Sequence, residues 1–156
     1  MEFETKRLSA DLDVIAPDGS EARIPLGLER GSMAHFQIPP GHTSRSVAHK
    51  TVEEIWLVLH GRGEMWRGQG DREETVSMEP GVCLSIPAGT RFQFRCLGRE
   101  PLQVVGVTMP SWPGGGLPSR WDLAADRLRA SRSQSSSSAA GPAPRGAIEA
   151  TPAHRR

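Results

Sequence analysis

Apolar and polar residues alternate over short runs between closely spaced turns in the middle of the chain. Glycine and proline clusters such as Pro39–Gly41, Gly61–Gly63 and Glu79–Gly81 mark the turns. Seven runs between turns have strand character: Met33–Ile38, Glu54–Leu59, Glu64–Trp66, Thr75–Met78, Val82–Ile86, Arg91–Cys96 and Leu102–Met109. No helical periodicity separates them, so the pattern predicts an all-β, antiparallel sandwich or barrel.

The run Arg91–Cys96 predicts which of its side chains point into the core. Its apolar residues fall at every second position and its polar residues fall between them: Phe92, Phe94 and Cys96 are the apolar ones. Because successive side chains of a strand point to opposite faces, we expect Phe92 and Phe94 in the interior.

The run Glu54–Leu59 is apolar on both faces. Trp56 and Val58 share the face of Glu54, and the opposite face carries Ile55, Leu57 and Leu59. A strand of this kind is covered on both sides. One cover would be the barrel interior, and the other would be a second sheet or a partner subunit. Since the three residues would otherwise form an exposed apolar patch, we predict a homodimer through this sheet.

Charge is unevenly placed along the 156 residues, although the formal net charge is only +1. Residues 127–156 carry six arginines and one acid, so residues 1–126 hold 13 basic and 17 acidic side chains, a net charge near −4. A mildly acidic body gives no electrostatic reason to bind nucleic acid or an anionic membrane, and neither is expected. The chain has no apolar run of membrane-spanning length and no leader-like N-terminus, so a cytoplasmic location is expected.

The composition divides the chain into four parts. Residues 1–29 are expected to form a strand or loop segment that packs on a barrel of residues 30–110. Residues 111–130 should form a loop and a short helix over Trp121–Ala130. Residues 131–156, rich in Ser, Ala, Gly, Pro and Arg, are expected to be a disordered tail. Cys83 and Cys96 lack metal-type spacing and are expected to be free thiols.

Two segments resemble the paired motifs of the cupin superfamily. The first family motif is Gly, five residues, His-x-His, three or four residues, Glu, six residues, Gly; here stand Gly41, Val47-Ala-His49, Glu54 and Gly61. The second is Gly, five residues, Pro-x-Gly, two residues, His, three residues, Asn; here stand Gly81, Pro87-Ala-Gly89, Phe92 and Cys96. The resemblance covers roughly residues 30–110. It implies an antiparallel double-stranded β-helix, the jelly-roll barrel of the cupins.

The resemblance also implies a degenerate metal site. In cupins that bind a metal, three histidines and a glutamate point into the barrel, and here His49 and Glu54 stand at two of these four positions. Val47 and Phe92 stand at the other two and have no lone pair to donate. Two ligands fall short of a zinc or non-haem iron site, so no cofactor is expected. A divalent iron, zinc, manganese or nickel ion would need additional ligands, for which His35 and Gln37 are the candidates.

The expected function is to bind a small, largely apolar or aromatic molecule. The barrel pocket would be lined by Gln37, Val47, Trp56, Phe92 and Phe94. The alternative is an isomerase, cyclase or lyase in which His49 acts as the base and Glu54 orients it, or which carries a rebuilt divalent-metal site. A third hypothesis is a non-catalytic sensor or accessory protein. The absence of tyrosine removes the acid that cupin epimerases are understood to use, and the sequence leaves open whether the protein is an enzyme.

Overall fold

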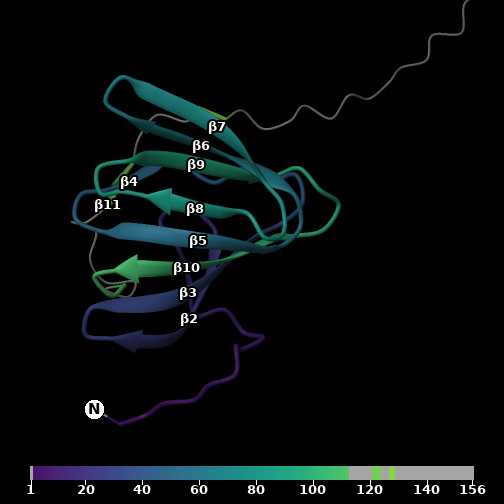
Figure 1. Cartoon of the computed structure of the whole chain (residues 1–156). Helices are drawn as coiled ribbons and strands as arrows, with labels where there is room; N and C mark the ends of the chain where they lie inside the picture. The colour runs from purple at the N-terminus through teal and green to yellow at the C-terminus, as the bar shows by residue number, and fades with distance from the viewer. Residues whose placement is uncertain (1, 113–120, 124–126, 129–156) are drawn as a thin grey trace, which may run out of the picture.

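All regular structure in the described residues is β, as predicted (Figure 1). The structure is a computed structural model that describes residues 2–112, 121–123 and 127–128. Its strands are β1 Val14–Ile15, β2 Glu21–Leu28, β3 Gly31–Ile38, β4 Val47–His49, β5 Glu53–His60, β6 Gly63–Gln69, β7 Arg72–Met78, β8 Cys83–Ile86, β9 Arg91–Cys96, β10 Leu102–Met109 and β11 Trp121–Leu123. No helix long and apolar enough to cross a membrane occurs in this part of the chain.

The strands form two antiparallel sheets that enclose the core between them. One sheet has the order β1-β2-β3-β10-β5-β8, and the other has the order β11-β4-β9-β6-β7. Neighbours in each sheet are often far apart in sequence, as when β10 lies between β3 and β5 (Figure 1). This arrangement is the expected cupin jelly roll. The N-terminal part contributes β2, which pairs with β3 and so extends the first sheet.

Aromatic side chains fill the interior where the two sheets face each other. Trp56 on β5 contacts Phe94 and Phe92 on β9 edge-on, with ring centroids 5.2 Å and 5.9 Å apart. All three are almost completely buried, and Met65 on β6 is fully buried beside them. Edge-to-face packing of this kind is the arrangement that aromatic rings prefer. The predicted inward direction of Phe92 and Phe94 is confirmed.

The outer face of β5 is exposed in the single chain. Ile55, Leu57 and Leu59 are 54%, 40% and 44% exposed, whereas Trp56 and Val58 on the inner face are 1% exposed. The second sheet packs on the inner face only, so the idea that it covers the outer one is wrong. A partner subunit stays a prediction.

A motif glycine closes the turn between β5 and β6 because no other residue fits there. Gly61 has a φ of 81°, in the left-handed region. A Cβ at this position would lie 2.4 Å from the carbonyl oxygen of Pro101. Both the backbone conformation and the close approach therefore require glycine.

The prediction of a short helix over Trp121–Ala130 is wrong for residues 121–123. Residues 121–123 form strand β11, which pairs with β4; the backbone register partners are Trp121 with His49 and Leu123 with Val47. The physical reason is that β4 would otherwise be an edge strand, whose unpaired backbone groups readily accept another strand. Residues 131–156, predicted to be disordered, lie outside the described residues.

Candidate functional site

The two motif residues with polar side chains come from opposite sheets. His49 ends β4, and Glu54 lies near the start of β5. The N–H of Gly89 donates a hydrogen bond of 2.7 Å to the carbonyl oxygen of His49. The turn of the second motif thus holds the end of the strand that carries the histidine of the first.

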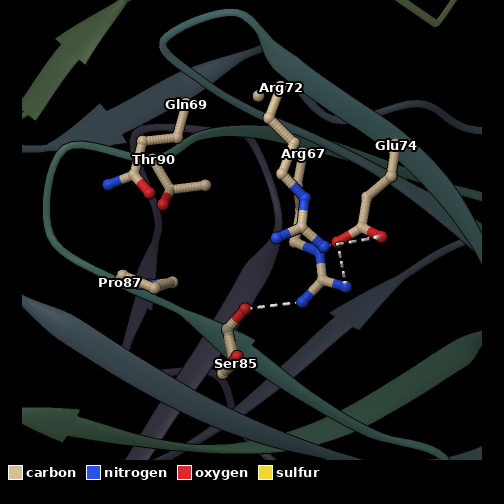
Figure 2. Close-up of a pocket in the computed structure, with 8 residues that line it drawn as sticks. Arg67, Gln69, Arg72, Glu74, Ser85, Pro87 and Thr90 are labelled. Carbon is tan, nitrogen blue, oxygen red and sulfur yellow. Dashed lines mark hydrogen bonds and ion pairs between the residues drawn. The ribbon is translucent and has the colours of Figure 1, made fainter.

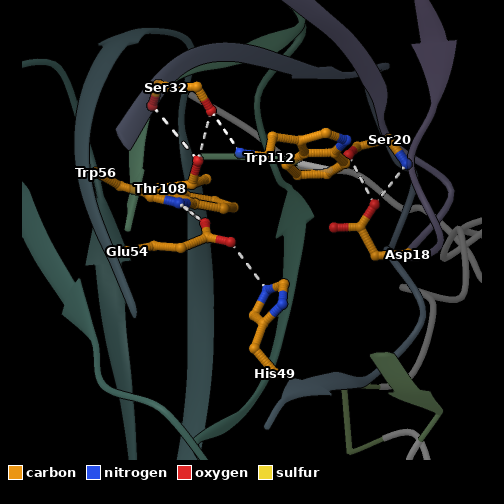
Figure 3. A network of polar contacts seen from close by, with 8 residues as sticks. All are labelled: Asp18, Ser20, Ser32, His49, Glu54, Trp56, Thr108 and Trp112. Atoms are coloured by element: carbon orange, nitrogen blue, oxygen red, sulfur yellow. Dashed lines mark hydrogen bonds and ion pairs between the residues drawn. The ribbon is translucent and has the colours of Figure 1, made fainter. Parts of the chain in front are cut away.

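His49 and Glu54 form a buried polar pair inside the barrel. Nε2 of His49 lies 2.9 Å from Oε1 of Glu54, and each side chain is 1% exposed. The second carboxylate oxygen of Glu54 accepts a hydrogen bond from Nε1 of Trp56 (Figure 3). Nε2 of His49 thus lies against one oxygen of the carboxylate, and Trp56 donates a hydrogen bond to the other.

Val47 and Phe92, at the other two motif positions, pack against this pair. They are register partners in β4 and β9, and both are buried. The ring of Phe92 stacks on the imidazole of His49 with centroids 5.4 Å apart and an interplanar angle of 24°. Apolar surface therefore lies where the family's metal-binding members have imidazole nitrogens.

The structure does not bring His35 and Gln37 to this site. Ala34, Phe36 and Ile38 take the inner face of β3, so the alternating side chains of His35 and Gln37 lie on the other face. There, Nε2 of His35 lies 3.4 Å from Oε1 of Gln103, and Nε2 of Gln37 donates to Oε2 of Glu21 at 3.2 Å. The hypothesis that His35 and Gln37 supply extra ligands, and that Gln37 lines the barrel, is wrong, because both side chains lie on the outer face of β3.

The residues present do not fit the family's metal ion. His49 and Glu54 remain as donors, and Glu54 already binds two side chains. No group of three or more His, Cys, Asp or Glu side chains arranged to hold a metal ion occurs among the described residues. Two donors beside a valine and a phenylalanine are too few for the usual zinc or iron sites.

Sequence reasoning missed Asp18, a carboxylate that lies near the pair. Asp18 is in the turn between β1 and β2 and is 3% exposed. Its Oδ1 accepts hydrogen bonds from the backbone N–H and the hydroxyl of Ser20, at 2.8 Å and 2.7 Å. Figure 3 shows its second oxygen pointing into the space between Trp112 and His49. The motif Asp18-Gly-Ser20 is typical of an exposed turn, so its burial could not be read from the sequence.

The surroundings of Asp18 favour its neutral form. Burial raises the pKa of Asp18, and the negative charge of Glu54 raises it further. The hydrogen bonds from Ser20 and the charge of His49 act in the opposite direction but are smaller than the effect of burial. Asp18 is thus a carboxyl group that holds its proton to a higher pH than usual.

Trp112 closes one end of the barrel above these polar groups. Its backbone N–H donates to the hydroxyl of Ser32 at 2.7 Å, and that hydroxyl also bonds the hydroxyl of Thr108 at 2.7 Å. Its ring packs on Phe36 with centroids 5.5 Å apart. Figure 3 shows the indole beside Ser20 and over the space that Asp18 faces.

The fold and this site define a cupin barrel, and comparison with known proteins agrees. The family model described as "Cupin domain" matches residues 34–108. Residues 34–108 therefore form a cupin domain.

One curated relative and two solved structures illustrate the range of similar proteins. The xanthan biosynthesis protein XanB of Xanthomonas campestris pv. campestris is 28% identical over 101 residues, which are 65% of this chain and 21% of XanB. KdgF from Halomonas sp. has a TM-score of 0.58 at 15% identity, covering 70% of this chain and 97% of KdgF. A deletion mutant of oxalate decarboxylase OxdC from Bacillus subtilis has a TM-score of 0.56 at 17% identity, covering 63% of this chain and 28% of OxdC.

These similarities show the fold of this chain but not its activity. The chain spans about a fifth of the length of XanB. The two structures are less than 25% identical to it, so they show only a shared architecture.

Proposed function

We propose that this protein is a ligand-binding cupin that takes a small, largely apolar or aromatic molecule into its barrel without a metal ion. The observation that carries the proposal is the stacking of Phe92 on His49, with Val47 as the register partner of Phe92. Hydrocarbon in these positions makes the surroundings of the imidazole suited to an apolar molecule rather than to an ion.

The ligand would use the aromatic walls and the polar pair in different ways. The rings of Trp56, Phe92 and Phe94, which pack edge-on in the single chain, would contact an aromatic group of the ligand. The His49–Glu54 pair offers a polar contact for one hydroxyl or carbonyl of the ligand. Trp112 packs over the barrel end, so entry displaces this side chain and lets the ligand's ring replace it against Phe36.

The test is ligand binding by untagged, full-length protein. Protein purified without added metal is analysed for bound elements, and a denatured sample is extracted and searched by mass spectrometry for a bound small molecule. Benzoate, phenol and indole are then titrated while tryptophan fluorescence is recorded. We expect less than stoichiometric metal and a saturable fluorescence change with at least one compound. Stoichiometric metal that is lost in His49→Ala would overturn the proposal, as would no saturable change and no extracted molecule.

A second candidate is a proton-transfer enzyme, and Asp18 favours it. Nε2 of His49 has an orienting carboxylate oxygen at 2.9 Å, and burial raises the pKa of the nearby Asp18. A base and an acid in the same pocket are what an acid–base catalyst needs. In this case His49 would take a proton from an apolar substrate and Asp18 would return one. Loss of turnover in both His49→Ala and Asp18→Asn, with substrate binding retained, would distinguish this enzyme from the binding protein.

A further inference from the structure

A small pocket lies between the facing edges of the two sheets, separate from the His49–Glu54 pair. On one side is β8, the edge strand of the first sheet, and on the other is the β6–β7 hairpin of the second (Figure 2). The cavity has a volume of about 160 Å³. Its polar lining residues are Arg67, Gln69, Arg72, Glu74, Ser85 and Thr90.

The pocket has a net positive charge because two guanidinium groups share one carboxylate. Nη2 of Arg67 lies 2.9 Å from Oε1 of Glu74, in a well-formed ion pair. Nη2 of Arg72 lies 4.0 Å from the other oxygen of Glu74, at the limit of an ion pair, and its side chain is 84% exposed. Arg72 is thus the cation that a further anion would engage.

Two shielded donors that line the pocket have no acceptor among the described residues. The hydroxyl of Thr90, a residue that is 4% exposed, makes no hydrogen bond. Nε of Arg67 also has none, although Nη1 of the same side chain donates to the carbonyl oxygen of Ser85 at 2.6 Å. Figure 2 shows Thr90 beside Gln69, on the opposite side of the pocket from the guanidinium of Arg67. Shielded donors without acceptors, beside an incompletely neutralised cation, favour a group rich in acceptor oxygens.

We propose that this pocket binds a small oxyanion, the carboxylate or phosphate group of a metabolite. The guanidinium of Arg72 turns from Glu74 to the anion, and the hydroxyl of Thr90 donates a hydrogen bond to it. Arg67 stays in place, since its hydrogen bond to Ser85 joins the edges of the two sheets and its ion pair with Glu74 holds it to the neighbouring strand. This site goes beyond the proposed barrel ligand and does not depend on it.

The test is a titration of the full-length, isotope-labelled protein in which NMR records the amide chemical shifts. Sodium phosphate and sodium acetate are added in separate series, with sodium chloride holding the ionic strength constant. We expect saturable shifts for the amides of Gln69, Arg72 and Thr90 with at least one of the two anions. Arg72→Gln should weaken the binding about tenfold, which is the usual effect of losing one charge-assisted hydrogen bond.

Two further variants separate this site from a general effect of charge. Arg62→Gln is the matched control, because Arg62 is also exposed and paired with one carboxylate, Glu79, at 3.5 Å, but does not line this pocket. It should leave the binding unchanged. Thr90→Val keeps the side-chain shape and removes the donor, so it should weaken the binding several-fold while the remaining spectrum stays the same.

The outcomes decide both the site and the kind of anion. Saturation by phosphate alone supports a tetrahedral oxyanion, and saturation by acetate alone supports a carboxylate. Linear, unsaturable shifts with both anions overturn the proposal, and so do equal effects of Arg72→Gln and Arg62→Gln.

Discussion

The phenyl ring of Phe92 lies flat against the imidazole of His49, with the ring centroids 5.4 Å apart. Val47 is the register partner of Phe92 on the neighbouring strand. In metal-binding cupins both positions are histidines, so two substitutions would give this barrel the same four ligand positions.

The first prediction is that Val47→His combined with Phe92→His creates a metal site. The larger side chain at position 47 is offset by the smaller one at position 92, so the barrel should tolerate the pair. Three imidazoles and Glu54 then form a complete ligand set, and the variant should bind about one equivalent of zinc or iron(II). Isothermal titration and elemental analysis measure the stoichiometry.

The control for this prediction is the same double substitution combined with Glu54→Gln. The neutral amide is a much weaker ligand than the carboxylate, so metal affinity should fall strongly. Equal metal uptake by the wild-type protein and the double variant would contradict the proposed loss of the site.

The second prediction concerns the stability that Glu54 contributes. Glu54→Ala removes the carboxylate oxygen that lies 2.9 Å from Nε2 of His49 and leaves Nε1 of Trp56 without its acceptor inside the barrel. An unsatisfied buried group costs about 1–3 kcal/mol, so the free energy of unfolding in urea should fall by roughly 2–5 kcal/mol. Glu54→Gln keeps an acceptor and should cost less.

Glu53→Ala is the matched control, because Glu53 is the preceding residue of β5 and is exposed. Its substitution should change the free energy of unfolding by less than about 0.5 kcal/mol. If Glu54→Ala had an equally small effect, the pair would not hold the two sheets together.

The third prediction is a loss of stability in mild acid that depends on His35. Burial lowers the pKa of His35, and the nearby charge of Arg23 lowers it too, against the opposing hydrogen bond to Gln103. The unfolded chain therefore takes up a proton at a higher pH than the folded one. The stabilisation is complete above the ordinary histidine pKa of 6.5 and is lost as the pH falls from there through the lower folded pKa.

Urea unfolding of the wild type, His35→Gln and His42→Gln at a series of pH values measures this effect. His35→Gln removes the titrating group, so its free energy of unfolding should fall less steeply below pH 6.5. His42 is exposed, and its substitution should preserve the wild-type slope. Parallel pH profiles of the free energy of unfolding for the wild type and His35→Gln would show that His35 does not cause the loss of stability in acid.

The fold could be predicted from the sequence because its signals are local. Part of the candidate site could not be predicted, because it depends on contacts between distant segments. The turn at Gly61 needs a positive φ whatever surrounds it, and the alternation around Phe92 needs only one buried face. Such requirements are visible in one short stretch of sequence.

Asp18 and strand β11 depend instead on contacts between distant segments. The carbonyl oxygen of Asp18 accepts the N–H of Arg45 at 2.7 Å, which ties a turn of exposed composition to the chain ahead of β4. Strand β11 forms because β4 offers an unpaired edge, and local helix propensity at Trp121–Leu123 cannot compete with that pairing. The position of His35 has a similar cause, since only the packed barrel selects which face of β3 lies inside.

The last prediction concerns the exposed apolar residues on β5. We propose that Ile55, Leu57 and Leu59 form the contact of a homodimer, because neighbouring Val107 on β10 and Met33 on β3 are also exposed, at 38% and 41%, and extend the patch across three adjacent strands. A patch of this kind is unfavourable in water and is suited to a second copy of the same surface. Light scattering after size exclusion should give a dimer for the wild type and a monomer for Leu57→Asp. Leu97→Asp, at a residue that is 50% exposed outside the patch, should remain a dimer. A wild-type monomer at micromolar concentration would exclude this interface and leave the patch free for a different protein.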